Sequence, residues 1–211
     1  MLGGAVAVLL LGQIAPAAAL AAINIDVMVF LFGMFVVGEA LSRSGYLDLL
    51  SRRFFRHART PGQLLALVIF GFGVLSALLM NDTLAIIGTP LVLGLAAQSR
   101  LPKRMLLFAL AFAITTGSVA SPIGNPQNLL VAVNSGLAAP FVTFAAWLLL
   151  PTIASLAAAW LVLRLYYRRE FSLSVPAACD PGPVAVPDPA LTRIVKCSLA
   201  ILVGLAIANI T

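Results

Sequence analysis

The stretch Ser121-Pro-Ile-Gly-Asn-Pro-Gln-Asn128 interrupts one of the most apolar regions of the chain. The sequence MLLFALAFAI (105–114) precedes it, and LLVAV (129–133) follows it. Two prolines and one glycine within eight positions make a continuous helix untenable here. If the flanking segments lie in a membrane, such a break exposes carbonyl groups from one half-helix and N–H groups from the other.

The composition places these segments in a membrane. Of 211 residues, 62% are hydrophobic and only 9% are charged, and the mean hydropathy is +1.08. A soluble domain carries about 25% charged residues. The sequence therefore predicts an all-α, polytopic membrane protein with the lipid bilayer as its main partner. The apolar segments cover residues 2–22, 25–42, 63–80, 84–97, 104–119, 129–137, 140–165 and 193–210.

The positions of the charges predict the topology. All 13 lysines and arginines fall in the loops 43–62, 98–104 and 164–196. Cytoplasmic loops are enriched in these residues, so we expect all three on the cytoplasmic side of the inner membrane. This explains the net charge of +6 without a nucleic-acid partner.

The three loops share one side only if an even number of crossings separates them. Residues 104–137 then form one interrupted crossing, and 140–165 returns. Segments 63–80 and 84–97 could be two full spans or a re-entrant hairpin. The second has only about 14 residues, which is short for a span, so the sequence favours the hairpin.

The polar triplet Asn81-Asp82-Thr83 separates the two arms of this hairpin. Asparagine and aspartate are ordinary turn residues, so an extramembrane turn is one interpretation. The other is a buried ion site, because a carboxylate at membrane depth costs roughly 2.5–3.5 kcal/mol and requires a cation, a proton or a buried partner. The triplet alone leaves both interpretations open.

Other segments receive structural interpretations. Residues 2–22 are predicted to form a transmembrane helix, and 43–60 an amphipathic helix in the membrane interface. Glu39 is expected to be neutralised by Arg43. We expect no enzymatic activity, because no nucleophile–base pair, zinc motif, phosphate loop or haem signal appears in the sequence. No cofactor is indicated apart from a coupling sodium ion or proton.

Two motifs in order resemble a known family. Asn81-Asp82-Thr83 with Thr89-Pro90, followed by TTGSVASPIGNPQNLL (115–130), is similar to the N-terminal half of the ion transporter superfamily. The nearest resemblance is to its citrate-transporter-like domain, in the arsenite pump and sodium/proton antiporter branch. The segment 26–51 also resembles the helix and amphipathic linker that precede the hairpin there.

The resemblance implies an inverted-repeat architecture with a re-entrant hairpin and a broken helix in each half. Residues 1–170 would form the first repeat, 171–191 a cytoplasmic Pro-rich linker, and 192–211 the start of a second, truncated repeat. The missing half would come from further residues or from a homodimer. The implied ion or substrate ligands are Asn81, Asp82, Thr83, Ser118, Ser121, Gly124, Asn125, Gln127 and Asn128, with sodium at Asn81, Asp82 and Asn125.

Two departures leave the substrate open. Antiporter-like members of the family often carry an acidic residue where this chain has Asn125. Dicarboxylate carriers favour a Ser-Asn-Thr tip, whereas Asp82 takes the middle position here. We therefore expect a secondary active transporter of a small ion, either an anion such as a carboxylate or arsenite, or sodium exchanged for protons. The alternative is a non-transporting assembly subunit of a larger membrane complex.

Overall fold

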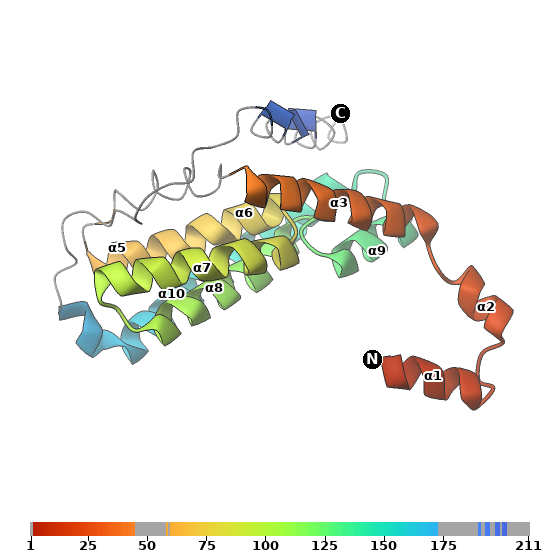
Figure 1. The fold of residues 1–211 in the computed structure, drawn as a ribbon, viewed down its shortest axis with the longest axis horizontal. Helices are drawn as coiled ribbons and strands as arrows, with labels where there is room; N and C mark the ends of the chain where they lie inside the picture. The colour runs from red at the N-terminus through yellow and green to blue at the C-terminus, as the bar shows by residue number, and fades with distance from the viewer. Residues whose placement is uncertain are drawn as a thin grey trace. The chain divides into compact units, whose positions relative to one another are not determined.

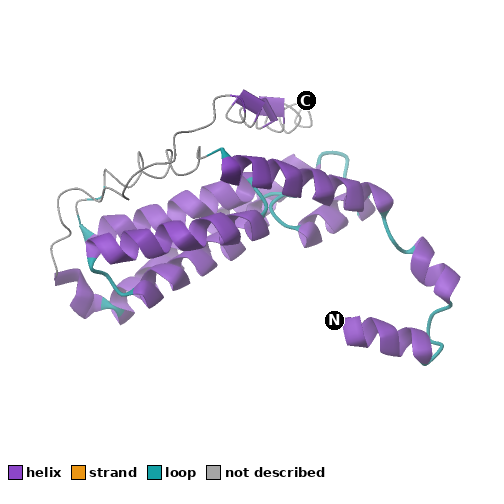
Figure 2. Ribbon diagram, viewed as in Figure 1, coloured by secondary structure: helices purple, strands orange, loops and turns teal. Residues whose placement is uncertain are grey.

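The computed structural model describes residues 2–44, 58, 60–172, 190, 193–194, 197–198 and 200–201. Within these ranges every regular element is helical and no strand occurs (Figure 2). The all-α prediction is therefore confirmed. Most of the predicted amphipathic helix 43–60 and nearly all of the linker 171–191 lie outside the described residues.

The chain divides into two compact units, residues 1–33 and 34–211. The first unit does not contain the single helix predicted over residues 2–22, and that prediction is wrong. Gly12 adopts a positive φ of 66°, and Ala15 is extended before Pro16, so the helix ends and restarts. The elements of this unit are α1 (Leu2–Leu10), α2 (Pro16–Ala21) and the first part of α3 (Ile25–Arg43).

The second unit is a helical bundle. Figure 1 shows α6, α7 and α8 running alongside one another, and α8 packs against α6, α7 and α10. The first helix of the bundle is continuous through three elements, the middle one a π-helix. The elements are α5 (Pro61–Ala66), η1 (Leu67–Gly71), α6 (Phe72–Leu78), α7 (Asn81–Ser99), α8 (Lys103–Gly117), η2 (Ser118–Ala120), α9 (Pro126–Asn134), α10 (Pro140–Tyr166) and η3 (Arg168–Ser172).

Four helices in the described ranges are long and apolar enough to cross a membrane: Pro61–Leu78, Asn81–Ser99, Lys103–Ala120 and Pro140–Tyr166. The estimate of about 14 residues for the second hairpin arm is wrong, because α7 contains 19 residues. Both arms and the segment before the break reach spanning length. The re-entrant hairpin and the single interrupted crossing of 104–137 remain predictions.

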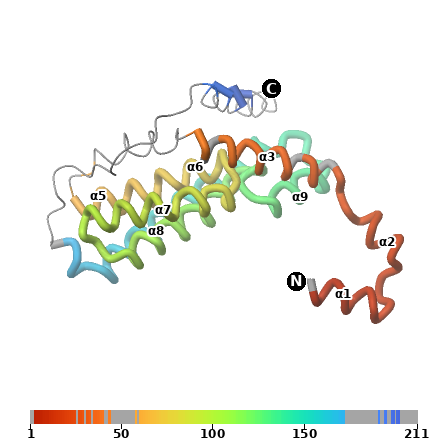
Figure 3. Tube along the Cα trace, viewed as in Figure 1, coloured from red at the N-terminus to blue at the C-terminus, as the bar shows by residue number. Residues whose placement is uncertain are grey.

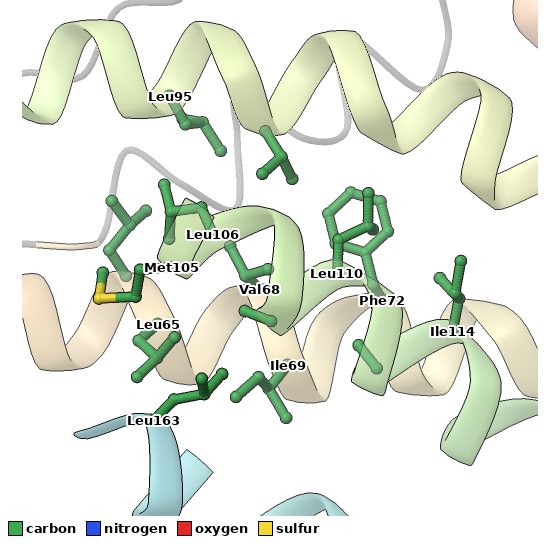
Figure 4. Packing of buried hydrophobic residues seen from close by; sticks show 14 of the residues in the cluster. Leu65, Val68, Ile69, Phe72, Leu95, Met105, Leu106, Leu110, Ile114 and Leu163 are labelled. Atoms are coloured by element: carbon green, nitrogen blue, oxygen red, sulfur yellow. The ribbon is translucent and has the colours of Figure 1, made fainter. Parts of the chain in front are cut away.

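The core of the bundle lies between α5–α6, α7, α8 and α10. Figure 4 shows side chains from these helices directed toward one another. On α8 the buried residues recur at helical spacing and form one face. The fully or nearly fully buried members of this cluster include Leu65, Ile69, Phe72, Leu95, Met105, Leu106, Leu110 and Leu163.

The bundle has two chemically different ends. Thr60 caps α5 by accepting the Gln63 N–H at 3.2 Å. At this same end, Trp160 of α10 donates its indole N–H to the Gly62 carbonyl oxygen at 3.4 Å. Helix α7 runs back alongside α5–α6 in the opposite direction, so its connection to α8 also lies at this end (Figure 1). We call this the basal end, made of the start of α5, the α7–α8 connection, the end of α10 and η3.

The part of α3 that belongs to the second unit carries one ion pair. The Arg43 Nε lies 2.6 Å from the Glu39 Oε1, one helical turn away, and both side chains are exposed. This confirms the predicted pairing of Glu39 with Arg43. Exposed pairs of this kind contribute about 0.3–0.5 kcal/mol, so the pair has little effect on the stability of the bundle.

Candidate ion-binding site

The first helix interruption consists of Leu79 and Met80. Leu79 is extended with φ −118° and ψ 150°, Met80 has φ −59° and ψ 138°, and α7 begins at Asn81. Both interrupting side chains are buried, with exposed fractions of 3% and 1%. The triplet Asn81-Asp82-Thr83 is thus the first turn of α7, not a turn between two helices as the sequence suggested.

The second interruption covers residues 121–125, between η2 and α9. Ser121 and Asn125 are extended, and the Asn125 Oδ1 accepts the Asn128 N–H at 2.8 Å. Asn125 is therefore the N-cap of α9, and Pro126 occupies the first helical position, where its missing N–H has no consequence. The helix therefore resumes at Pro126.

Side-chain amides tie the two ends of this second interruption together. The Asn125 Nδ2 donates to the Ser118 Oγ at 3.1 Å, and that hydroxyl donates to the Thr115 carbonyl oxygen at 2.9 Å. The Asn128 Nδ2 lies 3.2 Å, 3.2 Å and 2.9 Å from the carbonyl oxygens of Ser118, Val119 and Ser121. The Ser118 and Ser121 carbonyl oxygens also accept the backbone N–H groups of Ser121 and Gly124, at 3.5 Å and 3.3 Å. The Asn128 amide therefore adds a second donor to them and ties the first turn of α9 to the end of η2.

Gly124 allows the backbone of this interruption to fold onto itself. A Cβ atom at Gly124 would lie 2.2 Å from the Ser118 carbonyl oxygen and 2.8 Å from the Ser118 carbonyl carbon. Both atoms belong to the backbone, so no side-chain rearrangement could relieve the clash. Ser121 adds a local turn, because its Oγ accepts the Ile123 N–H at 3.3 Å.

The two interruptions meet in space. The Asn81 N–H donates to the Gly124 carbonyl oxygen at 3.0 Å, which joins the first turn of α7 to the break before α9 (Figure 3). Residues about forty positions apart, quoted as a pair from the sequence, are therefore neighbours. The C-terminal ends of α6 and η2 and the N-terminal ends of α7 and α9 converge at this place. We call it the break site.

Close packing behind the break site fixes α6 against α8. The Ser76 Oγ, fully buried, donates to the Ile114 carbonyl oxygen at 2.6 Å. A Cβ at Gly117 would lie 2.2 Å from the Gly73 carbonyl oxygen. Sequence reasoning missed Ser76, Gly73 and Gly117 as packing residues. Ala113 and Gly117, four residues apart on α8, form the small-residue spacing that marks close helix packing in membranes, and this signal could have found the contact.

Several of the predicted ligand residues have polar groups that make no hydrogen bond within the described residues. The Asp82 carboxylate and the Gln127 side chain are exposed and make no hydrogen bond or ion pair within the described residues. Thr83 is buried, and a Cβ on Gly38 of α3 would lie 2.6 Å from its hydroxyl oxygen. Among the residues that the structure covers, no group of three His, Cys, Asp or Glu could hold a metal ion.

The charge distribution separates the break site from the basal end. Asp82 is the one acidic residue in the described first turns of α7 and α9. The basic residues of the basal end lie about 27 Å from Asp82, because the 19-residue helix α7, with a rise of about 1.5 Å per residue, separates the two ends. Helix N-termini with free N–H groups attract anions, and carboxylate and amide oxygens attract cations. The break site thus offers groups for both signs of charge.

Comparison with known proteins identifies the family. The model of the citrate transporter family matches residues 1–211. The silicon efflux transporter LSI3 of Oryza sativa is 35% identical over 182 residues, which are 86% of this chain and 36% of that protein. The inner membrane protein YbiR of Escherichia coli is 34% identical over 58% of this chain and 33% of its own length. The putative transporter arsB of Dictyostelium discoideum is 25% identical over 79% and 29%.

The chain spans about one third of the length of these curated relatives. No solved structure matches it. The family match, the four apolar helices and the paired motifs agree with the resemblance inferred from the sequence. The chain is an integral membrane protein that belongs to the citrate transporter family.

Proposed function

We propose that the chain forms part of a secondary active carrier that moves a small ion or weak acid by alternating access, with the break site as half of its binding site. The observation that supports this most is the 3.0 Å hydrogen bond from the Asn81 N–H to the Gly124 carbonyl oxygen. It holds four helix ends at one place, and carriers use such discontinuous helices to bind coupling ions and anionic substrates.

The nine predicted site residues divide into two groups in this proposal. Ser118, Ser121, Gly124 and Asn125 form a frame, because their polar groups or their lack of a side chain hold the break itself. Asn128 contributes its amide nitrogen to the frame, while its Oδ1 accepts no hydrogen bond within the described residues. Asn81, Asp82, Thr83 and Gln127 form the ligand-facing group.

The coupling ion is a sodium ion or a proton bound near Asp82. The Asp82 carboxylate lies in the first turn of α7, beside the Asn81 side chain, whose Oδ1 accepts the Asp82 N–H at 2.9 Å. Asn125 was assigned to the sodium site from the sequence. Asn125 is buried, and its Oδ1 and Nδ2 bond Asn128 and Ser118 across the break, whereas Asn81 is partly exposed and uses its Oδ1 only on the next residue. We therefore place Asn125 in the frame and leave the cation to Asn81 and Asp82.

The negative charge of Asp82 constrains the cargo. A carboxylate substrate at the break site would be repelled unless a cation or a proton neutralises Asp82 first. A weak acid that is uncharged at neutral pH avoids this repulsion. We therefore favour an oxygen-rich neutral acid, such as silicic or arsenous acid, and place di- and tricarboxylates second. The name of one relative, a silicon efflux transporter, agrees with this order.

We also propose an orientation and an assembly. The basal end faces the cytoplasm of the inner membrane, because the described cations of α7–α8 and α10–η3 gather there. The second half of the binding site comes from further sequence in a longer carrier or from a second copy of the chain.

Transport measurements test the proposal. The protein is reconstituted into proteoliposomes, as the 211-residue chain and within any longer carrier that contains it, and flux of silicate, arsenite and di- or tricarboxylates is measured under sodium and proton gradients. Asp82→Asn and Asn125→Ala should each abolish flux and leave membrane insertion intact. Ser155→Ala, an exposed change on α10, serves as the control and should leave flux unchanged.

Unchanged flux in both variants would contradict the assignment of the break site as a binding site. Complete insertion with no flux of any tested solute, in every context, would favour the non-transporting assembly subunit.

A further inference from the structure

The basal end carries a concentration of cations that the described residues do not neutralise. Besides Arg169, five basic side chains there are exposed, and none of the five forms an ion pair with a described residue. By contrast, Arg43 on α3 is paired with Glu39. The five exposed cations are Arg100, Lys103, Arg104, Arg164 and Arg168.

Two of these cations occupy a position that is unfavourable without an external anion. Lys103 and Arg104 form the first turn of α8, where Pro102 provides no side-chain cap. Positive charge at a helix N-terminus is destabilising, because it lies against the positive end of the helix dipole. Nearby like charges add to this cost. Their arrangement indicates that a negatively charged partner approaches the basal end.

The outer surface of α10 shows what kind of partner fits. Arg164 stacks over the Trp160 ring, with its guanidinium carbon 4.9 Å from the ring centroid. Next to this pair, Leu161, Val162 and Leu165 expose 49%, 60% and 61% of their surface, and Tyr166 exposes 79%. An apolar surface that leads into aromatic and basic residues matches a phospholipid, with acyl chains beside the leucines and a headgroup beside the arginines.

We propose that the basal end binds an anionic phospholipid headgroup through Arg164 of α10 and Arg168 of η3, assisted by Lys103 and Arg104 of α8. A free phosphate ion would neutralise the basic side chains but would make no contact with the exposed apolar surface of α10. The lipid is therefore the occupant to which the geometry points. Its binding holds the end of α10 beside the start of α8 and does not depend on the proposed transport function.

Trp160 provides a built-in probe. The chain contains two tryptophans, and Trp147, with 76% of its surface exposed, lies 13 residues or about 20 Å along α10 from Trp160. In Trp147→Phe, the remaining fluorescence reports on the basal end. The protein is placed in nanodiscs of phosphatidylcholine that contain equal mole fractions of either brominated phosphatidylglycerol or brominated phosphatidylcholine. Nanodiscs expose both faces, so insertion orientation does not affect the comparison.

We expect brominated phosphatidylglycerol to quench Trp160 at least about threefold more effectively than brominated phosphatidylcholine. In the same background, Arg164→Gln with Arg168→Gln should reduce the ratio to about one, whereas Arg164→Lys should keep most of it. Arg43→Gln removes one cation that is already paired and should leave the ratio unchanged. Millimolar inorganic phosphate should not change it either.

Equal quenching by the two lipids would overturn the proposal, because the cations would then act only in setting the orientation of the chain in the membrane. A preference that survives Arg164→Gln with Arg168→Gln would also overturn it. Loss of the preference on addition of inorganic phosphate would assign the surface to a free anion in place of a lipid.

Discussion

The two helix interruptions that meet at the break site are held in different ways. The interruption at 121–125 supports itself: Asn125 caps the next helix, and Asn125 and Asn128 reach back to Ser118. The interruption at Leu79–Met80 has no such support, because Met80 gives α7 no side-chain cap. It is held by burial of its two apolar side chains and by the Asn81 N–H bond to Gly124. The first interruption therefore depends on the second.

This asymmetry means that the polarity of an interruption does not by itself indicate which polar groups are free to bind a ligand. The more polar of the two interruptions uses most of its polar groups on its own backbone, as buried polar groups must. The less polar one leaves the Asp82 carboxylate free of partners among the described residues. Variants of the two interruptions should consequently differ in kind. Changes in the frame should lower the free energy of unfolding and flux together, and changes at Asp82 should lower flux alone.

The largest expected effect comes from Gly124→Ala. The new Cβ would lie 2.2 Å from the Ser118 carbonyl oxygen, and only movement of the backbone could relieve this contact. We expect a loss of roughly 3 kcal/mol in the free energy of unfolding, the upper end for overpacking, together with loss of flux. SDS titration followed by circular dichroism measures the stability.

Gly94→Ala is the matched control for this change. Gly94 lies within α7, and a Cβ atom added there would have no neighbouring heavy atom within 4 Å. Alanine should therefore be neutral or stabilising by about 0.5–1 kcal/mol. If Gly124→Ala were as stable as Gly94→Ala, the fold of the second interruption would not require the close approach to Ser118.

An intermediate effect is expected for Asn125→Ala. This change removes the cap of α9 and the bond to the Ser118 hydroxyl, which should lower the free energy of unfolding by roughly 1–2 kcal/mol. Asn134→Ala, at the other end of α9, removes an exposed bond to the Leu130 carbonyl oxygen and should cost less than about 0.5 kcal/mol. Thermal unfolding in detergent compares the two variants. Equal midpoints would contradict the self-supporting character of the second interruption.

Much of this architecture followed from the sequence. Pro122, Gly124 and Pro126 within an apolar region required a break, and the family resemblance paired that break with Asn81-Asp82-Thr83. The structure places the two together through the Asn81–Gly124 bond. Composition and helix-breaking chemistry are local properties, so a sequence reveals them directly.

The predictions that were wrong concern features that tertiary packing determines. Polarity placed the first interruption at Asn81, whereas the apolar residues Leu79 and Met80 form it, because burial in the bundle stabilises an extended apolar pair. The same shift lengthened α7 from the expected length of about 14 residues to 19. The proposed division of Asn81, Asp82, Asn125 and Asn128 into frame and ligand groups depends on which hydrogen bonds each side chain makes, and spacing along the chain carries no such information.

The smallest and most specific effect isolates the bond between the interruptions. Asn81→Pro removes the N–H that donates to Gly124, yet proline is well tolerated at the first position of a helix, and Met80 already has the extended conformation that a following proline requires. Asn81→Ala removes the same side chain but keeps the N–H. Because the buried Gly124 carbonyl loses its donor only in the proline variant, that variant should be less stable than the alanine variant by about 1 kcal/mol. SDS titration of both variants measures this difference, and proteoliposome assays should find a further loss of flux in Asn81→Pro relative to Asn81→Ala. Equal stability and equal flux in the pair would mean that each interruption holds its position independently, since the lost hydrogen bond is the one difference in backbone donors between them.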